Sequence, residues 1–384
     1  MIPAGVLDLV ILGLGGVGSA AAFAASDRGL RVTGVDRFHP PHDRGSTHGD
    51  TRLIRLTYFE GADYVPLLRR SYALWEELQR EAGEELYVEC GLLEAGPRGG
   101  ALLSSLDAVS QAEGLALEAL DAAAVAARFP GFWLPPGCDA RFEARAGFLR
   151  VERCVTAHLR LANWRGVELR GGTRALGWTR RGPDHVEVEL EGGERLATRR
   201  LVVCAGPWAQ DLLADLGVPL RVARQPLLWF ASDPVHSLEA GAPGFLFETA
   251  GGGAYYGFPA EGGALKVARH GAGELVSDPL TVDRATRAAD ELDVRGFLDV
   301  HLPALRGRPL VRHAVCMYTN SPDEHFLVDR LPGAPEVVFA AGLSGHGYKM
   351  ASALGEALVA LALDEPTPTP LGFLGLSRFA GRAG

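Results

Sequence analysis

The protein has 384 residues, 47% of them hydrophobic, and carries a formal net charge of −9. The length indicates two domains, and the acidic balance argues against a partner such as nucleic acid or an anionic membrane, because both attract basic patches. Five cysteines without a C-x-x-C pair or a suitably spaced histidine argue against a disulfide scaffold and against structural zinc. Chemistry on a small molecule is therefore the starting hypothesis.

The N-terminal segment predicts a nucleotide-binding βαβ unit. Residues 8–12 form a short apolar run typical of a buried strand, and Gly13-x-Gly15-x-x-Gly18 follows it directly. A helix and a second strand come next, and this strand ends on Asp36. An acidic residue at this distance suits an adenosine ribose, and the helix N-terminus suits a pyrophosphate. At this point both NAD and FAD remain open.

Nothing in the sequence indicates export or membrane insertion. The N-terminus lacks the basic region of a signal peptide, and Asp8 and the clustered glycines interrupt its apolar run. The most apolar later stretch, residues 350–363, contains Glu356 and is shorter than the about 20 residues that span a bilayer. We therefore expect a soluble, cytoplasmic protein.

Helices and strands follow one another along the middle of the chain, without an internal repeat. Helical periodicity and turn residues predict helices at 64–83, within 101–129, at 150–166, at 207–217 and near 281–302. Alternation and short apolar runs predict strands at 86–96, a hairpin at 185–196, and strands at 201–205, 224–232, 254–259 and 264–270. The region from 220 to 318 is thus rich in strands.

The C-terminal segment decides between the cofactors. Residues 336–363 predict a strand, a glycine-rich turn and a helix. Two helix N-termini would then point at ligand, and an extended FAD fits such a pair better than NAD, because the pyrimidine edge of a flavin gains negative charge on reduction. We favour FAD, although Arg37 beside Asp36 leaves some room for NADP.

The predicted fold class is α/β, with a Rossmann-like FAD-binding domain interleaved with a mixed-sheet α+β substrate domain. Residues 1–90, 146–219 and 319–384 are assigned to the FAD-binding domain. Residues 91–145 and 220–318 are assigned to the substrate domain.

Lysine is almost absent. Among 38 lysine and arginine side chains, only Lys266 and Lys349 are lysines. An ammonium group is a compact charge whose pKa shifts readily on burial, which a guanidinium cannot match. The two lysines are therefore candidate functional residues, with survival by chance as the alternative.

Four further motifs resemble one enzyme family. In chain order they are GDTRLIR at 49–55, YYGFP at 255–259, CMYTNSPDEHFLVD at 316–329 and GLSGHGYK at 342–349. Together with the N-terminal glycines they are similar to the family of monomeric sarcosine oxidase and N-methyl-L-tryptophan oxidase, FAD-dependent amine oxidases of the D-amino acid oxidase superfamily. The resemblance spans nearly the whole chain and is weak at 95–145 and 160–200.

The resemblance implies a role for several side chains. It implies that Cys316 is bonded through sulfur to the flavin ring and that Lys266 promotes the reaction with O₂. It implies that Arg52 packs against the flavin and that Arg55 and Lys349 bind the carboxylate of the substrate. A buried thiol and surface ion pairs are the ordinary alternatives for Cys316 and the arginines.

The remaining implied positions are less distinctive, since a histidine or tyrosine is often only part of a core. His270 and Tyr318, with Lys266 and Arg52, make up the catalytic set, and Tyr256 joins Arg55 and Lys349 in binding substrate. The implied cofactor-binding residues are Gly13, Gly15, Gly18, Asp36, Arg37, Ser46, Thr51, Cys316, Gly345, Gly347 and Lys349. The polar run 323–326 is interpreted as a turn before a strand.

The implied reaction is oxidative demethylation of a small N-methyl amino acid by FAD and molecular oxygen, giving formaldehyde, a primary amine and hydrogen peroxide. No metal is implied. Leu56, Thr57, Phe59 and Met350 depart from the family pattern near the substrate, so N-methyl-L-tryptophan and cyclic imino acids stay open as substrates. An NAD-linked dehydrogenase and a non-catalytic flavin-binding protein are alternatives of other classes. By resemblance alone we expect a monomer.

Overall fold

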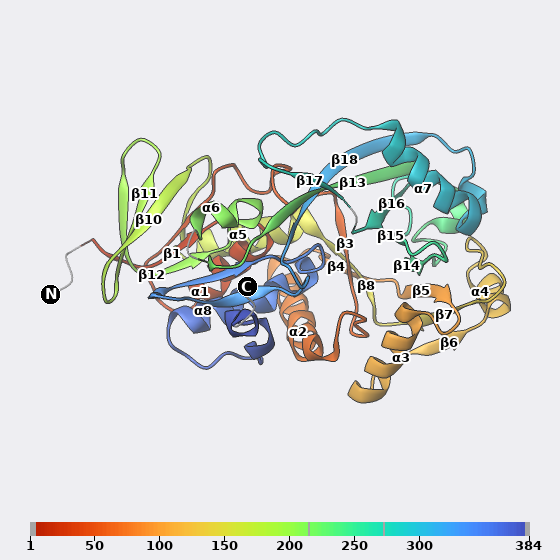
Figure 1. Ribbon diagram of the computed structural model, residues 1–384, viewed down its shortest axis with the longest axis horizontal. Helices are drawn as coiled ribbons and strands as arrows, with labels where there is room; N and C mark the ends of the chain where they lie inside the picture. Colours follow the sequence, from red (N-terminus) through yellow and green to blue (C-terminus); the bar gives the residue numbers. More distant parts are fainter. Residues whose placement is uncertain (1–4, 214–215, 272, 381–384) are drawn as a thin grey trace.

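A computed structural model describes residues 5–213, 216–271 and 273–380 (Figure 1). One eight-stranded sheet has the order β10-β11-β12-β1-β2-β9, with β20 beside β12 and β19 beside β20. The pairs among β1, β2, β9, β12 and β20 are parallel, and β10, β11 and β19 add antiparallel edges. The strand bounds are β1 Leu7–Leu12, β2 Val32–Val35, β9 Glu168–Arg170, β10 Ala175–Gly182, β11 His185–Leu190, β12 Arg195–Val203, β19 Leu327–Leu331 and β20 Ala334–Ala341.

Helices α1 (Gly16–Ser26), α5 (Val151–Trp164) and α8 (Ala351–Ala362) cover one face of this sheet, and α2 (Val65–Ala82) packs against α8 (Figure 1). Helix α1 contains mainly alanine and glycine, which lets α8 approach closely. A Cβ added to Gly355 of α8 would lie 2.5 Å from the backbone nitrogen of Ala21. This contact fixes α1 against α8, the two helices whose N-termini the sequence assigns to one cofactor.

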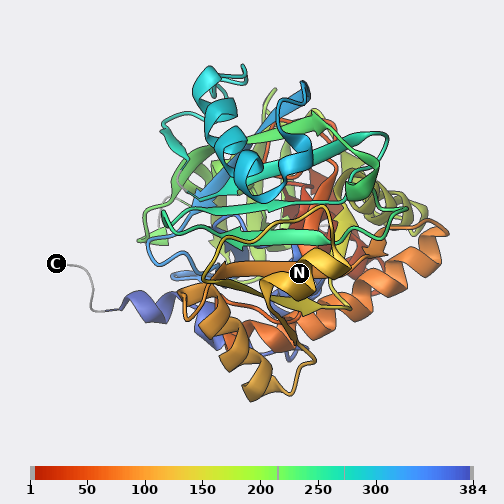
Figure 2. The same cartoon turned by 90° about the vertical axis from the view of Figure 1, so that its right-hand side faces the viewer.

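A nine-stranded sheet has the order β17-β13-β16-β15-β14-β5-β7-β6, with β18 beside β13. Helix α7 (Ala288–His301) packs on one face, and α3 (Ala101–Glu113) packs on part of the other face (Figure 2). The strand bounds are β5 Leu92–Pro97, β6 Glu118–Leu120, β7 Cys138–Glu143, β13 Arg221–Ala231, β14 Gly244–Glu248, β15 Ala254–Gly257, β16 Ala264–His270, β17 Glu274–Val276 and β18 Leu310–Asn320. A short helix, α4 (Ala122–Arg128), joins β6 to the segment before β7.

A small third sheet, in the order β3-β8-β4, carries two of the arginines predicted for the site. Its strands are β3 (Thr51–Ile54), β8 (Gly147–Arg150) and β4 (Tyr87–Glu89). Arg52 lies within β3, and Arg55 follows its last residue. The three antiparallel strands therefore fix the backbone that carries both guanidinium groups.

The structure confirms most of the predicted elements and corrects two. In place of the helix predicted at 207–217 there is a 3₁₀ turn at Gly206–Trp208 and a short helix, α6 (Ala209–Leu212), and residues 214–215 lie outside the described ranges. Residues 86–96 form two strands of different sheets, β4 and β5, because Gly91 between them has a φ of +74°, which breaks an extended strand. The strands β3, β6, β7, β8, β9, β10, β14, β17 and β18 were not predicted. Among them β3, β6, β8, β9 and β17 have only three or four residues, too few for a clear local pattern. Within the described ranges, no helix is long and apolar enough to cross a bilayer.

Candidate active site

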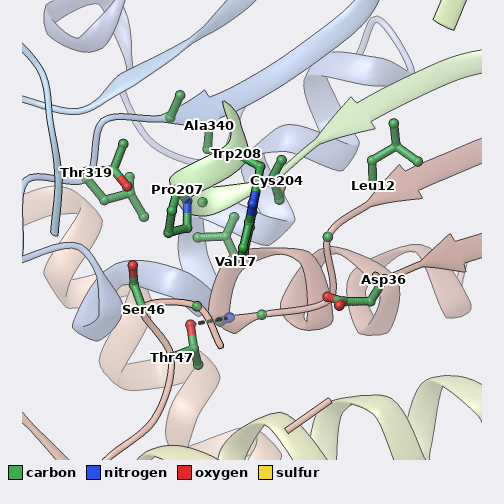
Figure 3. Close-up of a pocket in the computed structure, with 18 of the residues that line it drawn as sticks. Leu12, Val17, Asp36, Ser46, Thr47, Cys204, Pro207, Trp208, Thr319 and Ala340 are labelled. Carbon is green, nitrogen blue, oxygen red and sulfur yellow. Dashed lines mark hydrogen bonds between the residues drawn. The ribbon is translucent and has the colours of Figure 1, made fainter. Parts of the chain in front are cut away.

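A large cavity lies at the carboxyl ends of β1, β2, β12 and β20, the edge at which open parallel sheets bind nucleotides (Figure 3). Its wall comes from the glycine turn before α1, the loop 45–47, the turn 204–208 and the turn 342–347. The labelled residues Asp36 and Thr319 lie at opposite sides of the view, with Val17 between them. Of α1, the first two residues, Gly16 and Val17, line the cavity, which therefore extends across the N-terminus of this helix.

The glycine turn is closely packed, and its glycines have different tasks. Gly13 has a φ of +89°, and a Cβ there would lie 2.4 Å from the carbonyl oxygen of Cys204. A Cβ on Gly18 would lie 1.8 Å from the carbonyl oxygen of Gly13. Gly13 and Gly15 line the cavity, whereas Gly18 lies behind the turn and lets α1 start there.

Asp36 closes one end of the cavity. Its carboxylate accepts hydrogen bonds from the backbone N–H groups of Leu14 and Phe38, both 2.8 Å long, and lies 3.2 Å from Nε2 of His42. These contacts fix the carboxylate at the tip of β2, where a ribose can be bound. Arg37 also lines this cavity.

Three buried polar atoms of the cavity wall lack hydrogen-bond partners among the described residues: Ser46 Oγ, Trp208 Nε1 and Thr319 Oγ1. Buried polar groups are almost always paired, so these atoms indicate a polar ligand. Near them, the loop 45–47 is held to α1, since the N–H of Gly16 donates to Thr47 Oγ1 over 3.1 Å (Figure 3). The cavity thus has the shape, the helix N-terminus and the free polar groups that an FAD requires.

A second, smaller cavity adjoins the first. Both are lined by Arg52, Tyr318, Gly345 and Tyr348. Gly345 has a φ of +78°, and a Cβ there would lie 2.2 Å from the Tyr318 ring, so this glycine gives the ring its place between the cavities. The remaining lining residues of the second cavity are Leu53, Arg55, Phe59, Glu60, Leu246, Tyr256, His270, His346 and Lys349.

Cys316 lies beside the junction of the two cavities. The Nη2 of Arg52 is 3.3 Å from the sulfur of Cys316 and donates to the carbonyl of Ser46 over 3.1 Å. The sulfur is also 3.4 Å from that carbonyl, and its residue is 1% exposed. The sulfur is thus held in a fixed position between the guanidinium and this carbonyl.

Not every predicted residue reaches a cavity. Of the residues predicted for the site, Ser46, Gly345 and Gly347 line a cavity. Gly18, Thr51, Lys266 and Cys316 are not among the described residues that line either cavity. The last three are next to the wall: Thr51 and Lys266 contact each other behind Arg52.

Lys266 is buried and held by oxygens. Its Nζ donates to the carbonyls of Gly49 over 2.5 Å and Thr51 over 2.8 Å, and lies 4.7 Å from the centre of the Phe258 ring. Burial, followed by the charge of Arg52, lowers the pKa of Lys266 well below its usual range. The side chain of Lys266 is therefore held in position by its hydrogen bonds, and its charge depends on burial and on the neighbouring Arg52.

Arg55 is enclosed by acids and aromatic rings. Its Nη2 is 3.0 Å from Glu60, and its Nε is 3.3 Å from Glu94. The guanidinium also lies over the rings of Tyr58 and Phe59. Burial opposes ionisation of Glu60, but Arg55 outweighs it and lowers the pKa of that carboxyl. Neither Glu60 nor Glu94 was predicted from the sequence as a residue of this site.

Lys349 is the second buried lysine. Its Nζ donates to the carbonyl of His346 over 2.8 Å and lies 3.4 Å from the Tyr58 hydroxyl, which in turn is 2.5 Å from Nδ1 of His346. Burial and the charge of Arg55 lower the pKa of Lys349 to about 7. Both lysines of the chain are thus buried near the junction of the two cavities.

His270 and Tyr318 meet across the second cavity, with 3.3 Å between Nδ1 and the hydroxyl. Burial lowers the pKa of His270 to about 4, so this ring is neutral at neutral pH. The ring of Tyr256 lies near both. Neutral imidazole and phenol groups can orient a substrate by hydrogen bonds.

The predicted turn at 323–326 is confirmed. Asp323 accepts from the N–H of His325 and pairs with Arg378 over 2.8 Å, and β19 begins at Leu327. Within the described ranges, no group of three or more His, Cys, Asp or Glu side chains has an arrangement that holds a metal ion.

Comparison with known proteins decides the family. Residues 8–361 match the family model described as DAO, FAD dependent oxidoreductase. The chain belongs to this family. Over 378 residues it is 38% identical to monomeric sarcosine oxidase of Bacillus sp. (strain B-0618), covering 97% of this chain and 96% of the relative. Over 375 residues it is 39% identical to N-methyl-L-tryptophan oxidase of Salmonella arizonae, covering 97% and 99%.

Solved structures of the family share the fold. NikD, an unusual amino acid oxidase essential for nikkomycin biosynthesis, matches with a TM-score of 0.84 at 23% identity, over 97% of this chain and 98% of that one. L-proline dehydrogenase from P. horikoshii matches with a TM-score of 0.85 at 20% identity, over 99% of both chains. The predicted fold class and the predicted family are confirmed, and the chain is an FAD-dependent oxidoreductase related to amine oxidases.

Proposed function

We propose that the protein is an oxidase that removes the methyl group from a small N-methyl amino acid, with sarcosine as the model substrate. The observation that carries this proposal is the junction of the two cavities, where Arg52 and Tyr318 line both and Arg55 and Lys349 line the smaller one. A long cavity for FAD thus adjoins a small cavity with cations for a carboxylate. The names of the relatives, sarcosine oxidase and N-methyl-L-tryptophan oxidase, support an N-methyl amino acid as substrate.

When bound, FAD would supply a two-electron acceptor for the hydride of the N-methyl carbon, and O₂ would finally take up the two electrons, with two protons, as H₂O₂. The substrate, left as an imine, reacts with one water to give formaldehyde and the primary amine. We assign Gly13, Gly15, Asp36, Arg37 and Ser46 to the dinucleotide part of FAD, because they line the long cavity. Gly345 and Gly347 on its far wall, and Thr51 and Lys349 beside it, are assigned to the flavin end, with Gly18 supporting the turn.

In the small cavity, we assign the carboxylate of the substrate to Arg55 and Lys349. Tyr256, His270 and Tyr318 would orient the secondary amine, which must lose its proton before it can release a hydride. His270 is uncharged at neutral pH, so it does not repel an incoming ammonium group. The rate should therefore rise from pH 6 towards alkaline pH, and a flat profile of kcat/KM would contradict this assignment.

We further propose that the sulfur of Cys316 is the covalent attachment point of the flavin. This sulfur lies 3.3 Å from Nη2 of Arg52, a residue that lines both cavities, so it is next to the place proposed for the flavin ring. A tethered flavin stays in the pellet after acid precipitation, and we expect the Cys316→Ala variant to release it. Cys204 lines the same cavity and is the matched control, because Cys204→Ala should keep the flavin bound. Release of the flavin from the wild-type protein would disprove the attachment.

A panel of secondary amines separates the candidate substrates. Sarcosine, N-methyl-L-tryptophan, L-proline and L-pipecolate should be tested for both formaldehyde and H₂O₂. Demethylation yields both products in equal amounts, whereas oxidation of a cyclic imino acid yields H₂O₂ alone. A protein without flavin would indicate a nicotinamide enzyme, and a flavoprotein that no amine reduces under anaerobic conditions would indicate a binding protein.

The division of the chain into two interleaved domains, with FAD bound by residues 1–90, 146–219 and 319–384, is part of this proposal. So are a cytoplasmic location and a monomeric state. The five cysteines are all free thiols, which is usual in a reducing compartment, and one relative is named as monomeric. Cell fractionation and sedimentation velocity test these two points.

A further inference from the structure

Glu94 is a buried acid that the proposed reaction does not use. It lies on β5, is 0% exposed, and stands in one row with Leu246 of β14 and Tyr256 of β15, which line the small cavity. Residues directly opposite each other on neighbouring strands share a face of the sheet. The Glu94 carboxyl group therefore lies on the same side as the substrate, one strand beyond the cavity wall.

The carboxyl group of Glu94 has almost no polar surroundings. Neither of its oxygens has a hydrogen-bond partner among the described residues, and its nearest cation is Arg55 Nε at 3.3 Å. That guanidinium is already paired at Nη2 with Glu60 over 3.0 Å. One arginine thus faces two acids before any substrate is present.

Two other charged groups near Glu94 already have partners of their own. Glu143 of β7 accepts the N–H groups of Leu56 and Thr57, each over 2.8 Å. Arg141, opposite Glu94 on β7, pairs with Asp107 on the surface. Lys349 is the remaining cation that acts on Glu94.

A substrate carboxylate would add a further negative charge to this group. Three carboxylates around Arg55, with Glu143 behind them, exceed the positive charge of Arg55 and Lys349. A buried charge without a partner costs several kcal/mol, and an acid escapes this cost by binding a proton. Glu94 is the acid best placed to do so, because Glu60 lies at the cavity and Glu143 holds two N–H groups.

We propose that Glu94 is a positioning residue behind Arg55 that pairs with it as a carboxylate in the empty site at alkaline pH and is a neutral carboxylic acid whenever a substrate carboxylate is bound to Arg55. This inference rests on the proposed role of Arg55. Glu94 remains behind the guanidinium in either form. Burial raises the pKa of Glu94 to about 8 against the opposing effect of Arg55, so below that pH the acid is already mostly neutral, and above it one proton enters the site with each carboxylate bound.

The test measures binding of methoxyacetate, in which an ether oxygen replaces the amine of sarcosine, to the flavoprotein by absorbance titration. Glutamine resembles a protonated glutamate, so Glu94→Gln already has the form that binds the ligand. At pH 6.5 both proteins should bind equally, within about twofold. At pH 9 about ten ionised Glu94 exist for each protonated one, so the variant should bind about tenfold more tightly than wild type.

Two controls isolate the charge of the ligand and the site. Methoxyacetamide is neutral and should bind both proteins equally at either pH. Glu336 on β20 is also buried and paired with an arginine, far from the cavities, so Glu336→Gln should leave the affinity at pH 9 unchanged. Glu94 raises the pKa of Lys349, so its replacement makes Lys349 lose its charge at a lower pH. This effect weakens binding of a carboxylate by Glu94→Gln at pH 9, so it cannot produce the expected gain.

Equal affinities of wild type and Glu94→Gln at pH 9 would overturn the inference and leave the proposed function intact. A flavoprotein that binds no carboxylate at any pH and is reduced by no amine would overturn both. If Glu94→Gln does not fold, calorimetry of Lys349→Gln at pH 8.5 in two buffers of different ionisation enthalpy replaces it. Proton uptake on binding methoxyacetate then supports Glu94 as its site, and no uptake refutes it.

Discussion

The two adjoining cavities are built in different ways. The long cavity is formed largely by backbone, with the glycine turn at 13–18 and the turn at 342–347 on its walls. The small cavity is formed by side chains, among them Arg55, Glu60 and Lys349, that already pair with one another. The long cavity therefore has a fixed shape, and the small cavity is lined by charged groups that offset one another.

This difference has a physical consequence. A backbone cradle accepts a ligand without rearranging its own charges, so its failure should appear as loss of flavin. A balanced charge cluster must exchange one partner for another when substrate binds, so its failure should appear in KM and in pH dependence. Substitutions in the long cavity should therefore reduce the flavin content, whereas substitutions in the small cavity should alter KM and the pH dependence.

The most general effect is expected at Gly18, because a protein that loses its flavin can carry out neither half of the reaction. A Cβ there would lie 1.8 Å from the carbonyl oxygen of Gly13, and backbone cannot move aside as a flexible side chain can. Gly18→Ala should reduce the flavin content of the purified protein more than tenfold, a change worth over about 1.4 kcal/mol. The absorbance ratio of flavin to protein measures it.

Gly296 is the matched control, since it is also a helical glycine and a Cβ there meets nothing within 4 Å. Gly296→Ala should keep the flavin and unfold at an equal or higher temperature. Equal flavin content in the two variants would show that the turn tolerates change, and the contrast between the cavities would fail.

The long cavity is the part that the sequence predicts best. Its residues follow one another closely, since Gly13, Gly15, Gly18 and Asp36 belong to one βαβ unit with a fixed geometry. What the sequence does not predict on this side is Trp208, which enters from the turn after β12. That turn meets the cavity only through the parallel pairing of β12 with β1, which is a contact between distant segments.

The second effect concerns Lys266, the cation beside the junction. Lys266→Met removes a positioned charge, which should slow reoxidation of reduced flavin by O₂ about a hundredfold or more. Anaerobic reduction by substrate should change little. Because burial lowers the pKa of Lys266, reoxidation in the wild type should slow with rising pH earlier than an ordinary lysine would titrate.

Arg312 provides the control for Lys266→Met. It lies over the ring of Trp229, as Lys266 does, but is half-exposed and pairs with Asp50. Arg312→Met should leave the O₂ reaction unchanged in stopped-flow experiments. If Lys266→Met showed slow reduction by substrate and normal reoxidation by O₂, this lysine would act on the reaction with substrate and not on the reaction with O₂.

The small cavity illustrates what the sequence could not predict. Arg55 and Lys349 were identified because they lie in motifs. Glu60 and His346 are close to them in the sequence, but Glu94 comes from β5, a separate segment. From the local sequence alone, an acidic residue in a strand such as β5 is expected to face the solvent. A signal was present in Glu94 itself, an acid in the otherwise uncharged run 91–97.

The third effect is expected at Arg55. Arg55→Met leaves Glu60 and Glu94 without their cation and removes a partner of the substrate carboxylate, so KM should rise about a hundredfold or more. The flavin content should remain near that of the wild type. Arg141→Met, which breaks an ion pair on the neighbouring strand, should change neither. Loss of flavin in Arg55→Met would contradict the independence of the two cavities.

The smallest effect is expected at Tyr318, which lines both cavities. Tyr318→Phe keeps the ring against Gly345 and removes only the hydroxyl that lies 3.3 Å from His270. One hydrogen bond of this kind is worth about 0.5–1.5 kcal/mol, so kcat/KM should fall about two- to tenfold with an unchanged flavin content. Tyr255→Phe on the opposite face of the sheet, whose hydroxyl pairs with Asp293, should have no effect on kinetics. A large loss of flavin in Tyr318→Phe would mean that the hydroxyl serves the long cavity, because the ring alone would then be insufficient to separate the two sites.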